Sequence, residues 1–259
     1  MSQRKVVLIS NGMSVLGTAI CRRMQRDGFT VAASYPTGQR TPEAWLSAQR
    51  DDGFSFSAWC ADVGAFDDCA ALVGKVLAAH GRLDVLVNLA GAPGEAQSLG
   101  QLTPDSWRAA LRVSLDGAFN MDKHALAPML EQRWGRIIHL AASPAWAPPG
   151  SAECTSQAAA NAGLHGLTKS LALEVARQGV TVNTVVPGYL RHNPGAIGVA
   201  RAQVQANEAA IEASLLPRIP VGRLGEAADV AALIAYMASD NAAFLTGAQI
   251  AINGGQHMC

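Results

Sequence analysis

Short runs of β-branched and apolar residues alternate along this chain with longer stretches of helical periodicity. Each run is almost continuously apolar, as a parallel strand buried on both faces must be, and the helical stretches between the runs supply the crossovers. This alternation predicts a single α/β sheet of the doubly wound Rossmann type, mostly parallel, with helices on both faces. The seven predicted strands are residues 5–10, 30–35, 54–60, 83–90, 135–141, 179–186 and 248–253.

The helical segments carry start and stop signals. The segments 104–105 (PD) and 225–229 (GEAAD) supply the acidic residues that are typical of helix starts, and Gly28, Gly81 and Gly179 stand where helices should end. We expect one domain over residues 1–259. Residues 191–219 are rich in Gly and Pro and then helical, which predicts an excursion that covers a binding cleft. The predicted helices are residues 16–27, 66–80, 106–132, 154–177 and 226–239.

Composition excludes several classes of function. Only 15% of the 259 residues are charged, and 20 basic residues balance 20 acidic ones, so no field attracts nucleic acid or an anionic membrane. The five cysteines are scattered without C-x-x-C spacing, which argues against a disulfide framework or a metal site. The first residues contain no long apolar run. We therefore expect a cytoplasmic protein with no membrane or nucleic-acid partner and no metal.

The segment ISNGMSVLGTAI, residues 9–20, joins the first strand to the first helix, where a nucleotide-binding Rossmann fold has its glycine-rich turn. Here the chain resembles the short-chain dehydrogenase/reductase family, whose turn reads T-G-x-x-x-G-x-G. That pattern places Ser10, Asn11, Val15 and Gly17 at the motif positions, with Gly12 beside them. Two of the three motif glycines are therefore replaced.

The two replacements differ in severity. Asn tolerates a left-handed backbone better than most residues, so Asn11 is a mild change. Val15 puts carbon where a phosphate oxygen would sit, and it adds strain if the backbone there needs a positive φ. The alternative interpretation is a turn that has relaxed around an empty site. Binding of a dinucleotide is thus in doubt.

Other marks of the family cover nearly the whole chain. ADV at 61–63 resembles the family's adenine-contacting Asp-Val, NLAG at 88–91 its N-x-A-G motif, and VNTVVPG at 182–188 the exit of its sixth strand. Each mark alone has a structural reading, since a buried Asn can merely tie loops together. The resemblance implies a cofactor-binding role for Asp62, Val63, Asn88, Ala90, Gly91, Pro187 and Gly188.

Within the family, the chain is most similar to the branch that reduces acetoacetyl-CoA and 3-oxoacyl-ACP. The resemblance implies NADPH as cofactor, an acyl thioester as ligand and a tetrameric assembly. The segment 30–35 lacks a terminal acidic residue and Arg40 lies nearby, which favours NADP over NAD. Arg40 has the alternative reading of a solvated loop residue.

The resemblance also locates the family's catalytic Asn-Ser-Tyr-Lys tetrad, and all four members differ here. Gln157 stands at the Tyr position and Asn161 at the Lys position, four residues apart on one helix face. Neither amide is an acid near neutral pH or carries a positive charge. Ala142 stands at the position of the catalytic Ser, and Ser143 follows it by one residue. Ser114 stands at the position of the catalytic Asn.

Substitute proton donors can be named near the expected cleft: Tyr189, His192, His139 and Cys154. Each has a plainer reading, such as a hydrogen-bonded core histidine for His139 or an apolar pocket wall for Tyr189.

Three functions remain open. The first is a catalytically silent relative that acts in assembly or ligand binding, as a homotetramer or in a mixed tetramer with an active paralogue. The second is an NADPH-dependent 3-oxoacyl thioester reductase with a substitute donor, and the third is a non-redox enzyme on the same fold. Loss of the acid, its electrostatic partner and the phosphate turn together favours the first.

Overall fold

The computed structural model describes residues 4–38, 42–89, 91, 98–141, 155–191 and 212–256. Its centre is one seven-stranded sheet in the order β3-β2-β1-β4-β5-β6-β7. Every neighbouring pair of strands is parallel, so the predicted Rossmann-type sheet is confirmed and is more uniform than the mostly parallel sheet expected. All seven predicted strands are present: β1 (Val6–Ile9), β2 (Thr30–Tyr35), β3 (Phe56–Cys60), β4 (Val85–Asn88), β5 (Gly135–Leu140), β6 (Val180–Pro187) and β7 (Gln249–Ile252).

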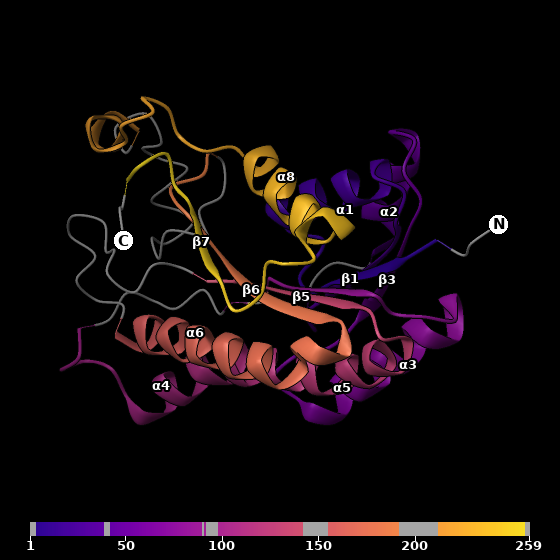
Figure 1. Ribbon diagram of the computed structural model, residues 1–259. Coiled ribbons are helices and arrows are strands. Elements are labelled where there is room, and N and C mark those ends of the chain that lie inside the picture. Colours follow the sequence, from indigo (N-terminus) through magenta and orange to yellow (C-terminus); the bar gives the residue numbers. More distant parts are fainter. Residues whose placement is uncertain are drawn as a thin grey trace.

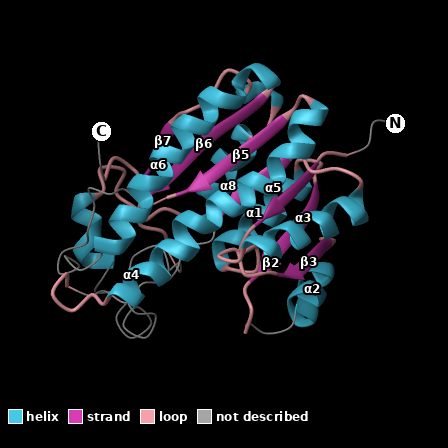
Figure 2. Cartoon of the chain, turned by 90° about the horizontal axis from the view of Figure 1, so that it is seen from below, coloured by secondary structure: helices cyan, strands magenta, loops and turns pink. Residues whose placement is uncertain are grey.

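Helices cover both faces of this sheet (Figure 1). One layer contains α1 (Val15–Arg26), α2 (Pro42–Asp51) and α8 (Ala227–Met237). The opposite layer contains α3 (Phe66–His80), α4 (Pro104–Leu111), α5 (Gly117–Gln132) and α6 (Thr155–Val175). In the view from below, α2 lies beside β3 at one edge of the sheet and β7 forms the other edge (Figure 2). Short 3-10 turns are η2 (Ala176–Gln178), η4 (Leu216–Arg218) and η5 (Asp240–Ala242).

The alternation of side chains along β1 explains why two layers form. Val7 and Ile9 join the core beneath α1 and α8, whereas Val6 and Leu8 join the core beneath α3 and α5. All four side chains are almost completely buried. A strand whose successive residues all face apolar helices must be apolar at every position, which is the pattern read from the sequence.

The predicted helix over residues 106–132 is wrong in detail. α4 begins at Pro104 behind the Thr103 N-cap, whose Oγ1 accepts from the amide of Ser106 at 3.1 Å. A π-helical turn, η1 (Arg112–Asp116), then separates α4 from α5. The backbone is helical on both sides of this turn, at Leu111 and at Gly117, so the chain carries no stop signal there. Such turns are frequent at functional sites.

The helix α2 was not predicted. It carries only one buried side chain, Gln49, and therefore lacks the apolar stripe by which helices are recognised. Of the expected excursion over residues 191–219, residues 192–211 lie outside the described part of the chain. No helix among the described residues is both long and apolar enough to cross a bilayer.

Candidate functional site

The predicted phosphate turn lies at the carboxyl end of β1, where the strand order switches from β1 to β4. Ser10 is buried and joins the two strands: its amide donates to the Val87 carbonyl at 3.0 Å, and its Oγ accepts from the Leu89 amide at 2.8 Å. Asn11 has a φ of 52°, the left-handed backbone that the replaced glycine would adopt. Asn11 therefore adopts a backbone conformation that glycine favours.

The turn is also tightly packed. A Cβ on Gly17 would lie 2.5 Å from the Asn11 carbonyl oxygen, and a Cβ on Gly12 would lie 2.7 Å from the Ala33 Cβ. Both contacts are closer than side chains tolerate, because they are too short for van der Waals contact. These two glycines are required by the shape of the turn itself.

Gly17→Ala is expected to lower the free energy of unfolding by about 1–3 kcal/mol, because the new methyl group overlaps backbone atoms of the turn. Urea unfolding monitored by circular dichroism measures this loss. The matched control is Gly74→Ala in α3, where a Cβ would meet no atom within 4 Å and should stabilise the helix. Equal midpoints for the two variants would contradict the close packing of the turn.

Val15 stands at the start of α1. Ser14 caps this helix, since its Oγ accepts from the Gly17 amide at 3.0 Å and donates to the Asn11 carbonyl at 2.8 Å. Val15 is the first helical residue and is 51% exposed. It is not among the residues with positive φ, so the strain expected at this position is absent. What remains is an apolar side chain at the helix end that would receive a phosphate.

The next predicted cofactor residues follow β3. Asp62 accepts from the Gly64 amide at 2.9 Å through Oδ1, and from Arg112 at 2.8 Å through Oδ2. Arg112 begins the π turn, and its guanidinium lies so close to Gly64 that a Cβ there would be 2.5 Å from Nη1. Val63 is buried against Gly117. Sequence reasoning missed Arg112, because no local pattern signals a contact between residues fifty positions apart.

The end of β4 carries the N-x-A-G resemblance. Asn88 is buried, and its Nδ2 donates to Asp122 Oδ1 at 2.9 Å. Gly91 is exposed. Ala90 and Arg40 lie outside the described residues, so their predicted roles stay predictions.

The two central tetrad positions lie on α6. Gln157 and Asn161 are one helical turn apart on the same face, and both are partly buried. Ser114 is buried within the π turn. Ala142 and Ser143, together with the substitute candidates Cys154 and His192, lie outside the described residues.

The remaining predicted cofactor residues follow β6. A Cβ on Gly188 would lie 2.7 Å from the Asn253 Cα, and the Gly188 amide donates to the Ile252 carbonyl at 3.0 Å, so Pro187 and Gly188 are pressed against the end of β7. The Tyr189 amide donates to Gln256 Oε1 at 3.2 Å. Burial raises the pKa of the Tyr189 phenol to about 12, which makes it a weak proton donor near neutral pH.

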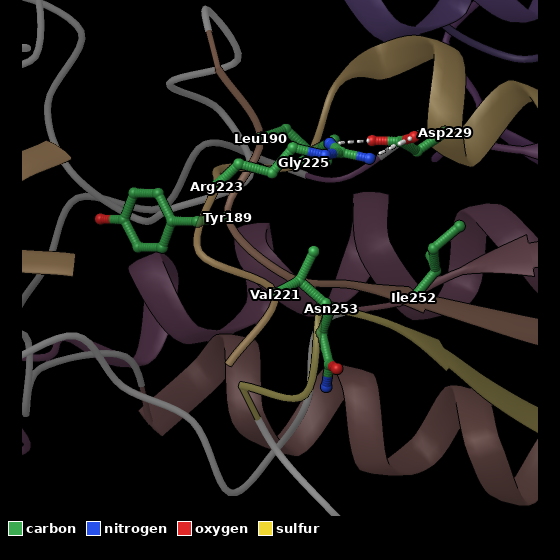
Figure 3. A pocket seen from close by; sticks show the side chains of 9 residues that line it. Tyr189, Leu190, Val221, Arg223, Gly225, Asp229, Ile252 and Asn253 are labelled. Atoms are coloured by element: carbon green, nitrogen blue, oxygen red, sulfur yellow. Dashed lines mark hydrogen bonds and ion pairs between the residues drawn. The ribbon is translucent and has the colours of Figure 1, made fainter. Parts of the chain in front are cut away.

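A cavity of about 170 Å³ opens between the ends of β6 and β7 and the start of α8. Arg223 and Asp229 form an ion pair at 2.7 Å on one side of it. The Tyr189 ring points away from that pair (Figure 3). The cavity is lined by Tyr189, Leu190, Val221, Arg223, Gly225, Asp229, Ile252, Asn253 and Gly254.

His139 lies inside the sheet and away from solvent, with an exposed fraction of 0%. Its ring nitrogens contact Asp122 and Thr168 at 2.9 and 2.7 Å. The plainer reading of this residue as a hydrogen-bonded core histidine is the one that the contacts support. Among the described residues, no group of three His, Cys, Asp or Glu side chains is placed to hold a metal ion.

Comparison with known proteins agrees with this geometry. A family model described as enoyl-(acyl carrier protein) reductase matches residues 12–257. The chain belongs to the short-chain dehydrogenase/reductase family. An acetoacetyl-CoA reductase of Cupriavidus necator is 36% identical over 258 residues, with 100% of both chains covered. A 3-oxoacyl-[acyl-carrier-protein] reductase of Staphylococcus aureus is 32% identical over 259 residues, again with 100% of both chains covered.

Among solved structures, that of gox2181 superposes with a TM-score of 0.84. The match covers 98% of this chain and 96% of that one at 23% sequence identity, which shows a shared fold alone. This short-chain dehydrogenase/reductase therefore resembles, in sequence, reductases of acetoacetyl-CoA and 3-oxoacyl-ACP. The sequence-based recognition of the family is confirmed.

Proposed function

We propose that this short-chain dehydrogenase/reductase is catalytically silent toward 3-oxoacyl thioesters and acts as an assembly or ligand-binding subunit. The observation that carries the proposal is the pair Gln157 and Asn161 on one face of α6, where the family resemblance implies Tyr and Lys. A carboxamide neither releases a proton near neutral pH nor carries a positive charge. A general acid contributes roughly 10²–10⁴ in rate, and its electrostatic partner is replaced as well.

The described substitute donors support the same proposal. Tyr189 is buried with a raised pKa, and His139 is enclosed by the sheet and bound to Asp122. A general acid must come within hydrogen-bond reach of the reacting oxygen, and a fully enclosed side chain does not meet that condition.

The residues at the expected nucleotide site fit a dinucleotide poorly. Asn11 adopts the left-handed backbone that glycine favours, but Val15 places an isopropyl group at the start of α1. Arg112 bonds the Asp62 carboxylate, which the family resemblance assigns to adenine. Family membership therefore favours NADP as the cofactor, whereas the side chains of Val15 and Arg112 oppose its binding.

The proposed role in assembly is supported by exposed apolar side chains on two neighbouring helices. Leu173 on α6 is 86% exposed, and Phe119 on α5 is about half exposed. A contiguous group of exposed apolar side chains marks a surface that binds another protein, and we propose that these two belong to one such surface. We propose a homotetramer or a mixed tetramer with an active paralogue, with an acyl thioester as a ligand that is not turned over. One domain over residues 1–259 and a cytoplasmic location complete the proposal.

A second candidate is an NADPH-dependent reductase of 3-oxoacyl thioesters that uses a substitute donor. Two observations favour it: the left-handed backbone at Asn11, and the activity named for the relatives of Cupriavidus necator and Staphylococcus aureus. A non-redox enzyme on the same fold is the remaining alternative.

Titration of the purified protein with NADPH distinguishes these functions. We expect no heat of binding at micromolar concentrations, because Val15 obstructs the phosphate end and Arg112 occupies Asp62. The matched control is the Asn11→Gly/Val15→Gly variant, which should bind more tightly by roughly tenfold or more. Micromolar binding by the unaltered protein would revive the reductase, and steady oxidation of NADPH by acetoacetyl-CoA would establish it.

A further inference from the structure

A carboxylate and an imidazole meet in the interior of this protein. His139 on β5 and Asp122 on α5 are both buried, and His139 Nε2 lies 2.9 Å from Asp122 Oδ2 and 3.2 Å from Oδ1. Two ionisable groups in the core are costly unless each is paired and hydrogen-bonded. The contacts around them therefore define which protons they carry.

Thr168 on α6 determines the proton on the other ring nitrogen. Its Oγ1 has three close partners: the Leu164 carbonyl at 2.8 Å, Thr184 Oγ1 at 2.7 Å and His139 Nδ1 at 2.7 Å. A carbonyl only accepts, and a hydroxyl has one proton to donate. All three contacts are hydrogen bonds only if Thr168 donates to Leu164 and accepts from both other groups. His139 Nδ1 therefore carries a proton.

The contact on the opposite side of the ring needs a second proton. His139 Nε2 and the Asp122 carboxylate bond to each other only with a proton between them, on the nitrogen or on the oxygen. In either case the pair has a net charge of zero, as imidazolium with carboxylate or as imidazole with carboxylic acid. A neutral pair is what a core position demands.

Hydrogen bonds connect the pair to two parts of the candidate site, the end of β4 and the helix α6. Asp122 Oδ1 accepts from Asn88 Nδ2 at 2.9 Å, and the next residue, Leu89, donates its amide to Ser10 at the phosphate turn. On the other side, Thr168 lies about two turns along α6 from Asn161. One cluster of hydrogen bonds thus reaches the end of β4 and the helix that carries the tetrad positions.

We propose that Asp122 and His139 share one proton and act as positioning residues, which hold the end of β4 and the helix α6 in register at the carboxyl edge of the sheet. This inference concerns the scaffold of the site and stands whether the protein is silent or active. The proton lies between two buried side chains and has no solvent contact.

Nuclear magnetic resonance of the full chain with isotopically labelled histidine tests the shared proton. Near neutral pH we expect the His139 ring to show a slowly exchanging proton on Nδ1 and a second proton in the contact with Asp122. The signals are assigned by their loss in His139→Asn. In Asp122→Asn the second proton should disappear, because an amide cannot neutralise an imidazolium. A His139 ring whose Nδ1 is unprotonated in the unaltered protein would overturn the proposal.

A double-mutant cycle tests the positioning role. Asp122→Asn and His139→Asn should each lower the melting temperature by roughly 10 °C, and the double variant should lose clearly less than the sum. Amide exchange at Leu89 and Asn161 should accelerate by roughly tenfold in each single variant, while Val31 on β2 keeps its rate. Asp105→Asn, an exposed carboxylate on α4, is the control without effect. Additive losses, or equal acceleration at Val31, would overturn the proposal.

Discussion

Asp84→Ala is expected to lower the free energy of unfolding by about 3 kcal/mol. Asp84 is fully buried before β4, and its Oδ2 accepts from the Val6 amide and from Arg82 Nε, each at 2.7 Å. Its Oδ1 accepts from Arg82 Nη2 at 2.6 Å, and this bonding raises the pKa of Arg82. Removing the carboxylate leaves a buried amide of β1 without its acceptor. The Arg82 guanidinium is partly exposed, so it can be solvated when its partner is removed. The expected loss of unfolding free energy therefore lies at the lower end of the range for a broken buried ion pair.

The measurement is the urea midpoint at equal slope, or the melting temperature, which should fall by roughly 6–12 °C. Asp105→Ala serves as the matched control, because Asp105 also bonds an arginine but does so on the exposed surface of α4. The control should unfold as the unaltered protein does. An unchanged midpoint in Asp84→Ala would show that the amino ends of β1 and β4 do not depend on this bridge.

The stabilising contacts of Asp84 and the candidate site lie at opposite ends of the same strands. Asp84 joins the amino ends of β1 and β4, whereas the phosphate turn and Asn88 lie at the carboxyl ends of the same two strands. Substitutions at Asn11, Val15 or Gln157 leave the bridge untouched. The family's catalytic positions can therefore diverge in this chain while the sheet keeps its order.

The sheet could be predicted from the sequence because its signal is local. A strand buried on both faces is apolar at consecutive positions, and β1 and the first three residues of β4 show that pattern. The helix α2 was missed because Gln49 is its one fully buried side chain, and the π turn at Arg112–Asp116 was missed because the backbone stays helical on both sides of it. Neither feature depends on a long hydrophobic stripe, which is the signal that a sequence-based prediction of helices uses.

The sequence predicts those parts of the candidate site whose residues lie close together in the chain. The positions of Asn11 and Gly17 in one turn, and of Gln157 and Asn161 on one helix face, follow from spacing and are found as expected. The contacts of Arg112 with Asp62 and of His139 with Asp122 join distant parts of the chain. An ionisable residue, Asp122, between the buried Met121 and Ala125 was the one available signal for the second contact.

Restoring the two tetrad positions alone is expected to give no acetoacetyl-CoA reduction. Gln157→Tyr/Asn161→Lys returns a phenol and an ammonium to one face of α6, but the cofactor must still dock at the turn beside Val15. Adding Asn11→Gly and Val15→Gly should permit both NADPH binding and turnover. The backbone tolerates these changes, because Asn11 already has a positive φ and Val15 begins the helix, where glycine costs little.

The four proteins are compared by NADPH oxidation with acetoacetyl-CoA, alongside calorimetric titration with NADPH. The unaltered chain and Gln157→Tyr/Asn161→Lys, the tetrad double variant, should show no turnover. Asn11→Gly/Val15→Gly, the turn double variant, should bind NADPH without turnover. The quadruple variant should show both NADPH binding and turnover. The turn double variant thus separates cofactor docking from proton transfer, since it restores the phosphate site and leaves both amides in place. Turnover by Gln157→Tyr/Asn161→Lys alone would contradict this coupling, because the native turn would then suffice for hydride delivery.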